Sequence, residues 1–134
     1  MFKNRAWNAA KKNDLSQAEI LMLTNEACRH LVGEHDFSSF KATGGLAKTS
    51  VRTIISAEVK ACGENMYYLE ICGDGFLYNM VRIITGTLVA VGKGKINPDD
   101  IPEIIASRDR TKAGMTAPAK GLTLFCAEYP NELQ

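Results

Sequence analysis

The chain has 134 residues, enough for one domain that buries about two-thirds of the surface exposed by its unfolded form. Its hydrophobic fraction of 46% and charged fraction of 23% are those of an ordinary soluble globular protein. The formal net charge of +1 excludes a chain that is basic throughout, so any surface for nucleic acid must be a local cluster of basic residues.

After a strand fragment predicted within residues 1–13, a helix is predicted to begin after residue 16. Ser16 followed three residues later by Glu19 is the signature of a capping box. Four apolar residues then recur at helical spacing and define a buried face: Ile20, Leu23, Ala27 and Leu31. Gly33 is expected to end this helix.

The next stretch, residues 33–40, is predicted to form one short helical turn. Its small polar residues are flanked by Phe37 and Phe40, which are three apart and suited to anchor such a turn. His35 lies beside Asp36, but adjacent side chains seldom point at each other. His30 and His35 are five apart, which misses the i, i+4 spacing of a helical metal pair, so no metal site is predicted.

Two strands joined by a turn are predicted from residue 51 to residue 72. Five apolar residues are expected to face the core from the first strand: Val51, Ile55, Ala57, Val59 and Ala61. Polar residues alternate with them and are expected to face outward: Arg52, Ser56, Glu58 and Lys60. The turn is Gly63-Glu64-Asn65, and residues 66–72 return as the second strand of a hairpin.

Residues 75–92 are predicted to form a buried helix, because they carry one charge, Arg82, among apolar residues on nearly all sides. A membrane-spanning helix is disfavoured by Asn79 and by the central position of Arg82. A buried guanidinium costs several kcal/mol unless an opposite charge meets it, which makes this residue the main functional clue.

No residue three or four positions from Arg82 is acidic. Two hypotheses remain open for its partner. In the first hypothesis, the side chain extends to the surface and pairs with an ordinary Asp or Glu of this chain. In the second, it meets a more distant group, which could be a carboxylate, a nucleic-acid phosphate or another polypeptide.

The last predicted helix begins at Asn97, an N-cap residue followed by Pro98 at the first helical position. Its buried stripe is Ile101, Ile104 and Ile105. A basic run at residues 108–112 ends it, residues 113–121 are expected to be an irregular loop, and residues 122–129 a closing strand.

This order of elements predicts one α+β domain over residues 1–134, with a largely antiparallel or mixed sheet covered by helices on one face. The other face must be met by water, a ligand or further chain. The cysteines, Cys28, Cys62, Cys72 and Cys126, form no CxxC pair and are predicted to be buried free thiols in a reducing, cytoplasmic location.

Five stretches in a fixed order resemble the TruA-type tRNA pseudouridine synthases. They are FKNRAW at 2–7, LVGEHDFSSF at 31–40, VRTI at 51–54, GDGFLYNMVRIITGTLVAVGKGK at 73–95 and RTKAGMTAPAKGLTL at 110–124. The resemblance implies a pseudouridine synthase fold, of which this chain would be the C-terminal half, similar to a ferredoxin or RRM domain.

Members of that family carry a catalytic aspartate in a Gly-Arg-Thr-Asp-Ala-Gly-like stretch of their N-terminal half. No aspartate of this chain has that context, and the family's upstream tyrosine that contacts the target uracil is also absent. The resemblance therefore implies that the N-terminal half is a required partner and that this chain alone is inactive.

The resemblance also implies roles for individual residues. Arg82 would pair with the catalytic aspartate, and Leu122 would pack against the target base. Basic residues that could meet phosphates flank this site: Arg108, Arg110, Lys112 and Lys120. The implied reaction is isomerisation of uridine to pseudouridine in tRNA without a metal or organic cofactor. Bacterial family members are homodimers that act on the anticodon stem-loop.

The alternative function is a non-catalytic RNA-binding or protein-interaction module. An RRM-type sheet would need exposed aromatic residues on its central strands. Tyr67 and Tyr68 are adjacent in a predicted strand and must point to opposite faces, so at most one of them could serve. A small-molecule-binding ferredoxin-like domain has no polar constellation to support it.

Overall fold

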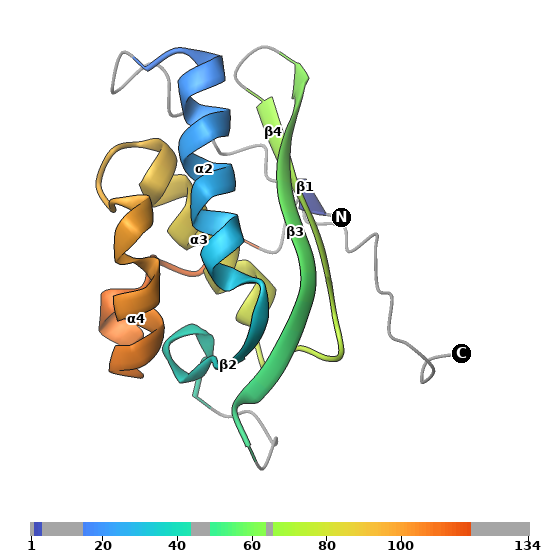
Figure 1. Ribbon diagram of the computed structural model, residues 1–134, viewed down its shortest axis with the longest axis vertical. Coiled ribbons are helices and arrows are strands. Elements are labelled where there is room, and N and C mark those ends of the chain that lie inside the picture. Colours follow the sequence, from blue (N-terminus) through green and yellow to red (C-terminus); the bar gives the residue numbers. More distant parts are fainter. Residues whose placement is uncertain (1, 4–14, 44–48, 64–65, 119–134) are drawn as a thin grey trace.

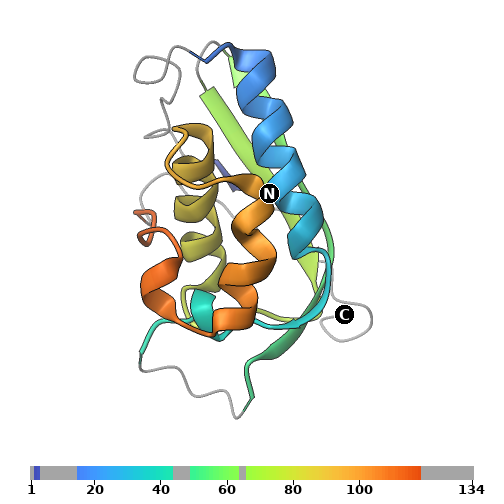
Figure 2. The same cartoon turned by 60° about the vertical axis from the view of Figure 1, so that its left-hand side comes forward.

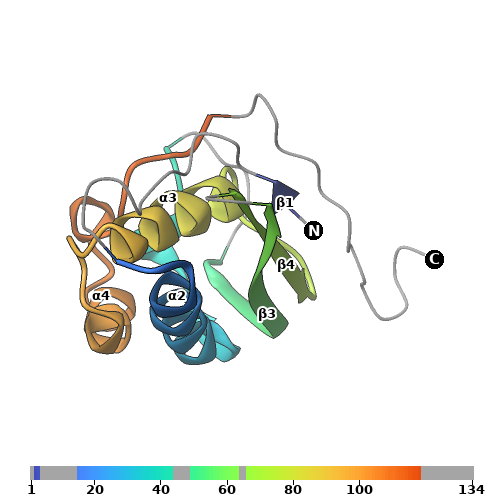
Figure 3. The ribbon, with the colours of Figure 1, turned by 90° about the horizontal axis from the view of Figure 1, so that it is seen from above.

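A computed structural model describes residues 2–3, 15–43, 49–63 and 66–118. It contains a four-stranded sheet in which all neighbouring strands are antiparallel, with helices on one face (Figures 1 and 3). The strand order is β1 (Phe2–Lys3), β4 (Met66–Gly73), β3 (Val51–Gly63) and β2 (Gly33–Asp36). The α+β prediction is confirmed.

Helix α2 (Gln17–Leu31) begins as predicted. The Ser16 hydroxyl accepts a hydrogen bond from the Glu19 amide, and the Glu19 carboxylate accepts one from the Ser16 amide. Ile20, Ala27 and Leu31 are buried against the sheet and the other helices. The helix ends at its C-cap, Val32, directly before Gly33.

Residues 33–40 do not form a single helical turn, so that prediction is wrong in part. Residues 33–36 are strand β2, which pairs with residues 51–54 of β3. Only Ser38–Phe40 form a short 3-10 helix, η1. Pairing between segments so far apart in the chain leaves no mark on local sequence periodicity. The anchoring role of Phe37 and Phe40 is confirmed, because both side chains are fully buried.

The β3–β4 hairpin is confirmed, but the predicted orientation of its first strand is wrong at Val51 and Ile55. These side chains are 44% and 50% exposed. The register moves from Ile54↔Gly73 to Ser56↔Cys72, so Ile55 is an extra residue in β3, a β-bulge. A one-residue bulge reverses which side chains face the core, and Ile54 is buried instead.

Helix α3 (Met80–Gly92) is buried as predicted, and it packs beside α2 (Figure 2). It begins at Met80 rather than near Gly75, because its N-cap Asn79 adopts a left-handed conformation with φ 60°. Asparagine tolerates that conformation better than most residues. Among the described residues, no helix combines the length and apolarity that crossing a membrane requires.

Helix α4 (Ile101–Ser107) follows a 3-10 turn, η2 (Pro98–Asp100), and another such turn, η3 (Arg110–Lys112), comes after it. The Asn97 side chain caps this segment by accepting from the Asp99 amide. Ile101, Ile104 and Ile105 are buried, which confirms the predicted stripe. The predicted closing strand at residues 122–129 lies outside the described residues.

The prediction of buried free thiols is confirmed only for Cys28, where burial raises the pKa of the thiol to about 12. Cys62 is free but exposed, and Cys72 is disulfide-bonded, so the prediction is wrong for both. Cys126 lies outside the described residues.

Candidate active site

Arg82 projects from α3 and is half-buried. Its Nε donates a hydrogen bond to the carbonyl oxygen of Ala117 at 2.7 Å. Its Nη1 donates to the side-chain oxygen of Asn79 at 3.2 Å. Both acceptors are neutral, so they orient the guanidinium without compensating its charge.

No carboxylate lies within ion-pair distance of Arg82 in the described part of the chain. The ion pairs found there have His30, Lys60 and Arg108 as their cations. The hypothesis that Arg82 pairs with an ordinary acidic residue therefore has no support among the described residues. The alternative, a partner beyond them, agrees with this geometry.

The segment that carries Ala117 lies directly on the backbone of α3. The Ala117 amide donates to the Arg82 carbonyl at 3.0 Å, so these two residues are joined by two hydrogen bonds. The Gly114 amide donates to the Thr87 hydroxyl at 2.9 Å. Figure 3 shows this segment running along α3 on the side away from α2.

Two glycines make this close approach possible. A Cβ added at Gly86 would lie 1.6 Å from the carbonyl oxygen of Met115. A Cβ added at Gly114 would lie 2.7 Å from the carbonyl oxygen of Gly86. Any side chain at either position would separate residues 113–117, here called the 113–117 segment, from the helix.

Arg110, in η3, also contacts the 113–117 segment. Its Nη1 donates to the Gly114 carbonyl at 2.8 Å, and its Nη2 donates to the Thr116 hydroxyl at 3.1 Å. The side chain is half-buried. Arg82 and Arg110 thus contact the same segment, one from the helix and the other from η3.

Apolar side chains flank this arrangement. Tyr78, directly before Asn79, is 55% exposed, and Met115 is 77% exposed. A cavity of about 210 Å³ lies beside Met115 and is lined by Gly86, Val89, Lys93, Met115, Thr116, Ala117 and Pro118. The 113–117 segment that Arg82 contacts therefore borders a largely apolar, open hollow.

The other basic residues predicted for the site lie apart from Arg82 or outside the described residues. Lys112 is exposed and lines a separate hollow with Lys95. Lys120 and Leu122 lie outside the described residues. No group of three or more His, Cys, Asp or Glu side chains placed to hold a metal ion occurs in the described part.

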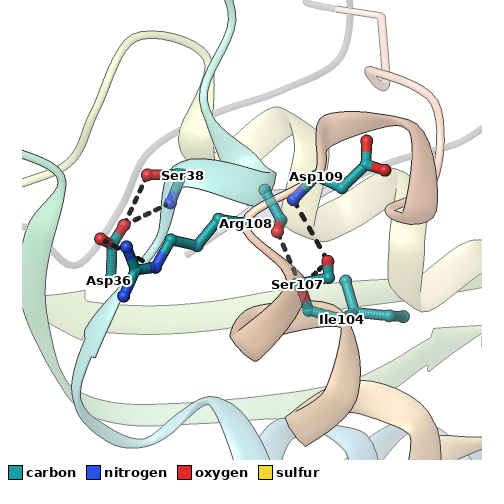
Figure 4. Close-up of polar contacts among 7 residues, drawn as sticks. Asp36, Ser38, Ile104, Ser107, Arg108 and Asp109 are labelled. Atoms are coloured by element: carbon teal, nitrogen blue, oxygen red, sulfur yellow. Dashed lines mark hydrogen bonds and ion pairs between the residues drawn. The ribbon is translucent and has the colours of Figure 1, made fainter.

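Arg108 lies at the end of α4, where it contacts Asp36 (Figure 4). Its Nε is 3.7 Å from the Asp36 carboxylate, and its side chain is 70% exposed. The same carboxylate accepts hydrogen bonds from the amide and the hydroxyl of Ser38. The Ser38 hydroxyl is the largest of the causes that lower the pKa of Asp36, and the Ser38 amide and the Arg108 charge act in the same direction.

Replacing Asp36 with asparagine is expected to lower the free energy of unfolding at neutral pH by about 1 kcal/mol. A carboxylate whose pKa is lower in the folded state than in the unfolded state stabilises the folded protein at every pH above its unfolded pKa of about 4. This stabilisation is lost as the pH falls through the pKa of the carboxylate in the folded state. The difference between Asp36→Asn and the unmodified chain in urea melts should therefore shrink below about pH 4.

Two further variants divide this effect between the groups that contact Asp36. Ser38→Ala should remove most of the pH-dependent part, whereas Arg108→Gln should remove little, because exposed ion pairs contribute about 0–1 kcal/mol. An Asp36→Asn difference that stays constant from neutral to acidic pH would contradict this account.

Comparison with known proteins assigns this chain to a family. The family model described as "tRNA pseudouridine synthase" matches residues 27–130. The chain is similar to two proteins named tRNA pseudouridine synthase A. It is 48% identical over 129 residues to the one from Ruminiclostridium cellulolyticum and 47% identical over 129 residues to the one from Acetivibrio thermocellus. Each match covers 96% of this chain and 50% of the relative. The protein of that name from Clostridium acetobutylicum is 52% identical to the chain over 107 residues, a match that covers 80% of this chain and 43% of the relative. The chain thus has about half the length of these relatives.

Proposed function

Because the chain belongs to the tRNA pseudouridine synthase family, we propose that it forms one wall of the active site of an enzyme that isomerises uridine to pseudouridine in tRNA. The observation that carries this proposal is the guanidinium of Arg82. It is held in place by Ala117 and Asn79, yet no carboxylate meets its charge within the described residues.

In the proposed reaction the bond between ribose and N1 of uracil breaks, and a new bond joins the same ribose carbon to C5. The hydrogen on C5 leaves as a proton and N1 gains one, so atoms and electrons balance without a co-reactant. The target base must leave its stack to be reached, which suits a cleft with apolar walls.

Arg82 is proposed to hold the catalytic aspartate. A guanidinium presents its N–H donors in a planar fork that matches a carboxylate, and its charge favours the ionised form of that acid. The contacts to Ala117 and Asn79 use the Nε donor and one of the two Nη1 donors. The carboxylate would approach the remaining donors.

The aspartate is proposed to come from an N-terminal half of the protein that is not part of this sequence. Support comes from the relatives, which are about twice as long as the matched region, and from the exposed apolar side chains of Tyr78 and Met115 beside the site. Exposed apolar groups of this kind are suited to burial by another domain.

The tRNA is proposed to be held by exposed basic residues. Arg108 and Lys112 are accessible for phosphate contacts, which position a nucleic acid without reading its sequence. The same role is proposed for Lys120, and packing against the target base for Leu122. Because the chain resembles bacterial family members, the whole enzyme is further proposed to be a cytoplasmic homodimer that acts on the anticodon stem-loop of tRNA.

The alternative function, a non-catalytic RNA-binding module, is less well supported by the sheet. Tyr67 is 1% exposed and lies under the helices, so it cannot stack on a base. Tyr68 is half-buried and would have to serve alone. Recognition by an RRM-type sheet uses aromatic residues that stack two or three bases.

The experiment uses the release of tritium from unmodified tRNA labelled at C5 of uridine. This chain alone is expected to release none, because it lacks the catalytic aspartate. Adding the part of the Ruminiclostridium cellulolyticum relative that this chain does not match should restore release. We call that combination the two-part enzyme.

The matched control is the same two-part enzyme with the family's catalytic aspartate replaced by asparagine, which should be inactive. Tritium release by this chain alone would refute the proposal. So would a two-part enzyme that co-purifies as a complex and binds tRNA but has no activity.

A further inference from the structure

The orientation of Arg82 depends in part on a residue that is far from it along the chain, Ala117. Its Nε donates to Ala117, and since the N–H groups of a guanidinium share one plane, fixing this bond fixes the direction of the other donors. Ala117 belongs to a stretch without helix or strand, residues 114–118. The Nε contact of the guanidinium is therefore held only as firmly as that stretch is held on α3, while the Asn79 contact at Nη1 comes from the N-cap of α3 itself.

Besides Arg82, two residues tie the 113–117 segment in place through side-chain contacts. Thr87 of α3 accepts from the Gly114 amide and is itself buried, with its hydroxyl donating to the Ile83 carbonyl at 2.8 Å. Arg110 donates to Gly114 and Thr116 from η3. The Arg110 bonds are charge-assisted, and such bonds are roughly twice as strong as neutral ones.

The same contacts weigh against Arg110 as a residue that binds a phosphate. To reach a phosphate, its half-buried side chain would have to leave both the Gly114 carbonyl and the Thr116 hydroxyl. Arg108 and Lys112, on either side of it in the chain, are exposed and need no such rearrangement.

We propose that Arg110 is a positioning residue: it secures the 113–117 segment on α3 and thereby aims the Arg82 guanidinium at the catalytic carboxylate. This inference deepens the proposed function and rests on it for the identity of the carboxylate. The geometric part, the dependence of Arg82 on Arg110, concerns this chain alone and can be tested separately.

The first test follows the Nε–H group of Arg82 by NMR in this chain, with its resonance identified by its loss in Arg82→Lys. Arg110→Gln should raise the rate at which this hydrogen exchanges with water by about fivefold, the effect of one hydrogen bond of typical strength. Arg108→Gln, a matched removal of an exposed arginine two residues away, should leave the rate unchanged. An unchanged rate in Arg110→Gln would overturn the inference.

A milder variant covers the possibility that Arg110→Gln does not fold. Thr116→Val removes one acceptor of Arg110 and keeps every charge. It should also raise the exchange rate of the Arg82 Nε–H, by a smaller factor than Arg110→Gln does. If Arg110 only bound phosphate, Thr116→Val would leave this exchange rate unchanged. An unchanged rate in a folded Thr116→Val chain would therefore overturn the inference too.

The second test separates catalysis from binding in the two-part enzyme. Arg110→Gln should lower kcat while the Kd for tRNA stays within about twofold, because positioning acts on the catalytic step. A lost phosphate contact would instead raise Kd and reduce the salt dependence of binding by about one unit of slope, and that result would overturn the inference. If the two-part enzyme proves inactive, the proposed function fails, while the NMR result still decides whether Arg110 positions Arg82.

Discussion

Replacing Arg82 with methionine is expected to lower kcat of the two-part enzyme by at least about 100-fold, the range seen when one preorganised charge-stabilising donor is removed from an active site. Methionine keeps the apolar stem of the side chain but cannot hold a carboxylate. Tritium release under saturating tRNA measures the effect. Kd for tRNA should stay close to that of the unmodified enzyme, since Arg82 is not proposed to bind phosphate.

The same substitution should affect stability much less than activity. Arg82→Met removes hydrogen bonds to Ala117 and Asn79, which are neutral groups, so the expected loss in this chain is about 1–3 kcal/mol. Breaking a buried ion pair would cost more, about 3–5 kcal/mol. Urea melts of this chain distinguish the two values.

Arg82→Lys is the matched control, because it keeps the charge and loses the Nε donor and the planar fork. It should remain severely impaired, since lysine cannot reproduce bidentate recognition of a carboxylate. A strongly destabilised Arg82→Met chain, together with normal activity of the Arg82→Met two-part enzyme, would refute the catalytic role of Arg82.

Gly86→Ala is expected to destabilise the chain by about 2 kcal/mol, even though alanine is the better helix former. The gain in helix propensity is about 1 kcal/mol. Against it stands a Cβ only 1.6 Å from the Met115 carbonyl oxygen, a separation that no small adjustment relieves. The 113–117 segment must therefore move away from α3, which breaks the pair of bonds between Ala117 and Arg82.

The control for this prediction is Gly63→Ala, where the added Cβ would meet the nearest atom, Met66 Cβ, at an ordinary 3.6 Å. Its stability should change by less than about 0.5 kcal/mol. Urea melts of both variants, with the Arg82 Nε–H resonance followed in each, provide the measurement. A Gly86→Ala chain that is more stable and keeps an unaltered Arg82 resonance would contradict the close packing described above.

Local patterns in the sequence were sufficient to predict the main helices and the hairpin. The capping box at Ser16 located the start of α2, and the apolar circumference around Arg82 predicted that α3 is buried. In each case the signal is a short-range periodicity or a capping residue, which acts through neighbours in the chain.

Features that depend on pairing between distant segments could not be predicted in this way. The bulge at Ile55 exists only relative to β4, and β2 exists only relative to β3. Both leave the local pattern of apolar residues ambiguous, and the one-residue bulge was enough to reverse the predicted orientation of Val51 and Ile55.

In the candidate site, too, only the features with a local signal in the sequence could be predicted. Arg82 was identifiable because a charge in an apolar helix without an acidic neighbour is energetically unusual. Its partners were not: Ala117 acts through its backbone, and the polar character of Asn79 disfavours a membrane span without indicating a contact with Arg82. The inward contacts of Arg110 depend on the path of the 113–117 segment, which has no periodicity to read.

We propose that the charge of Arg82 is met by a carboxylate from another part of the enzyme. A crystal structure of the two-part enzyme would show whether this contact forms. We expect an oxygen of the catalytic aspartate within about 4 Å of an Arg82 terminal nitrogen, while Nε still donates to Ala117. A structure in which the two parts are assembled and the Arg82 guanidinium meets no carboxylate would contradict the account.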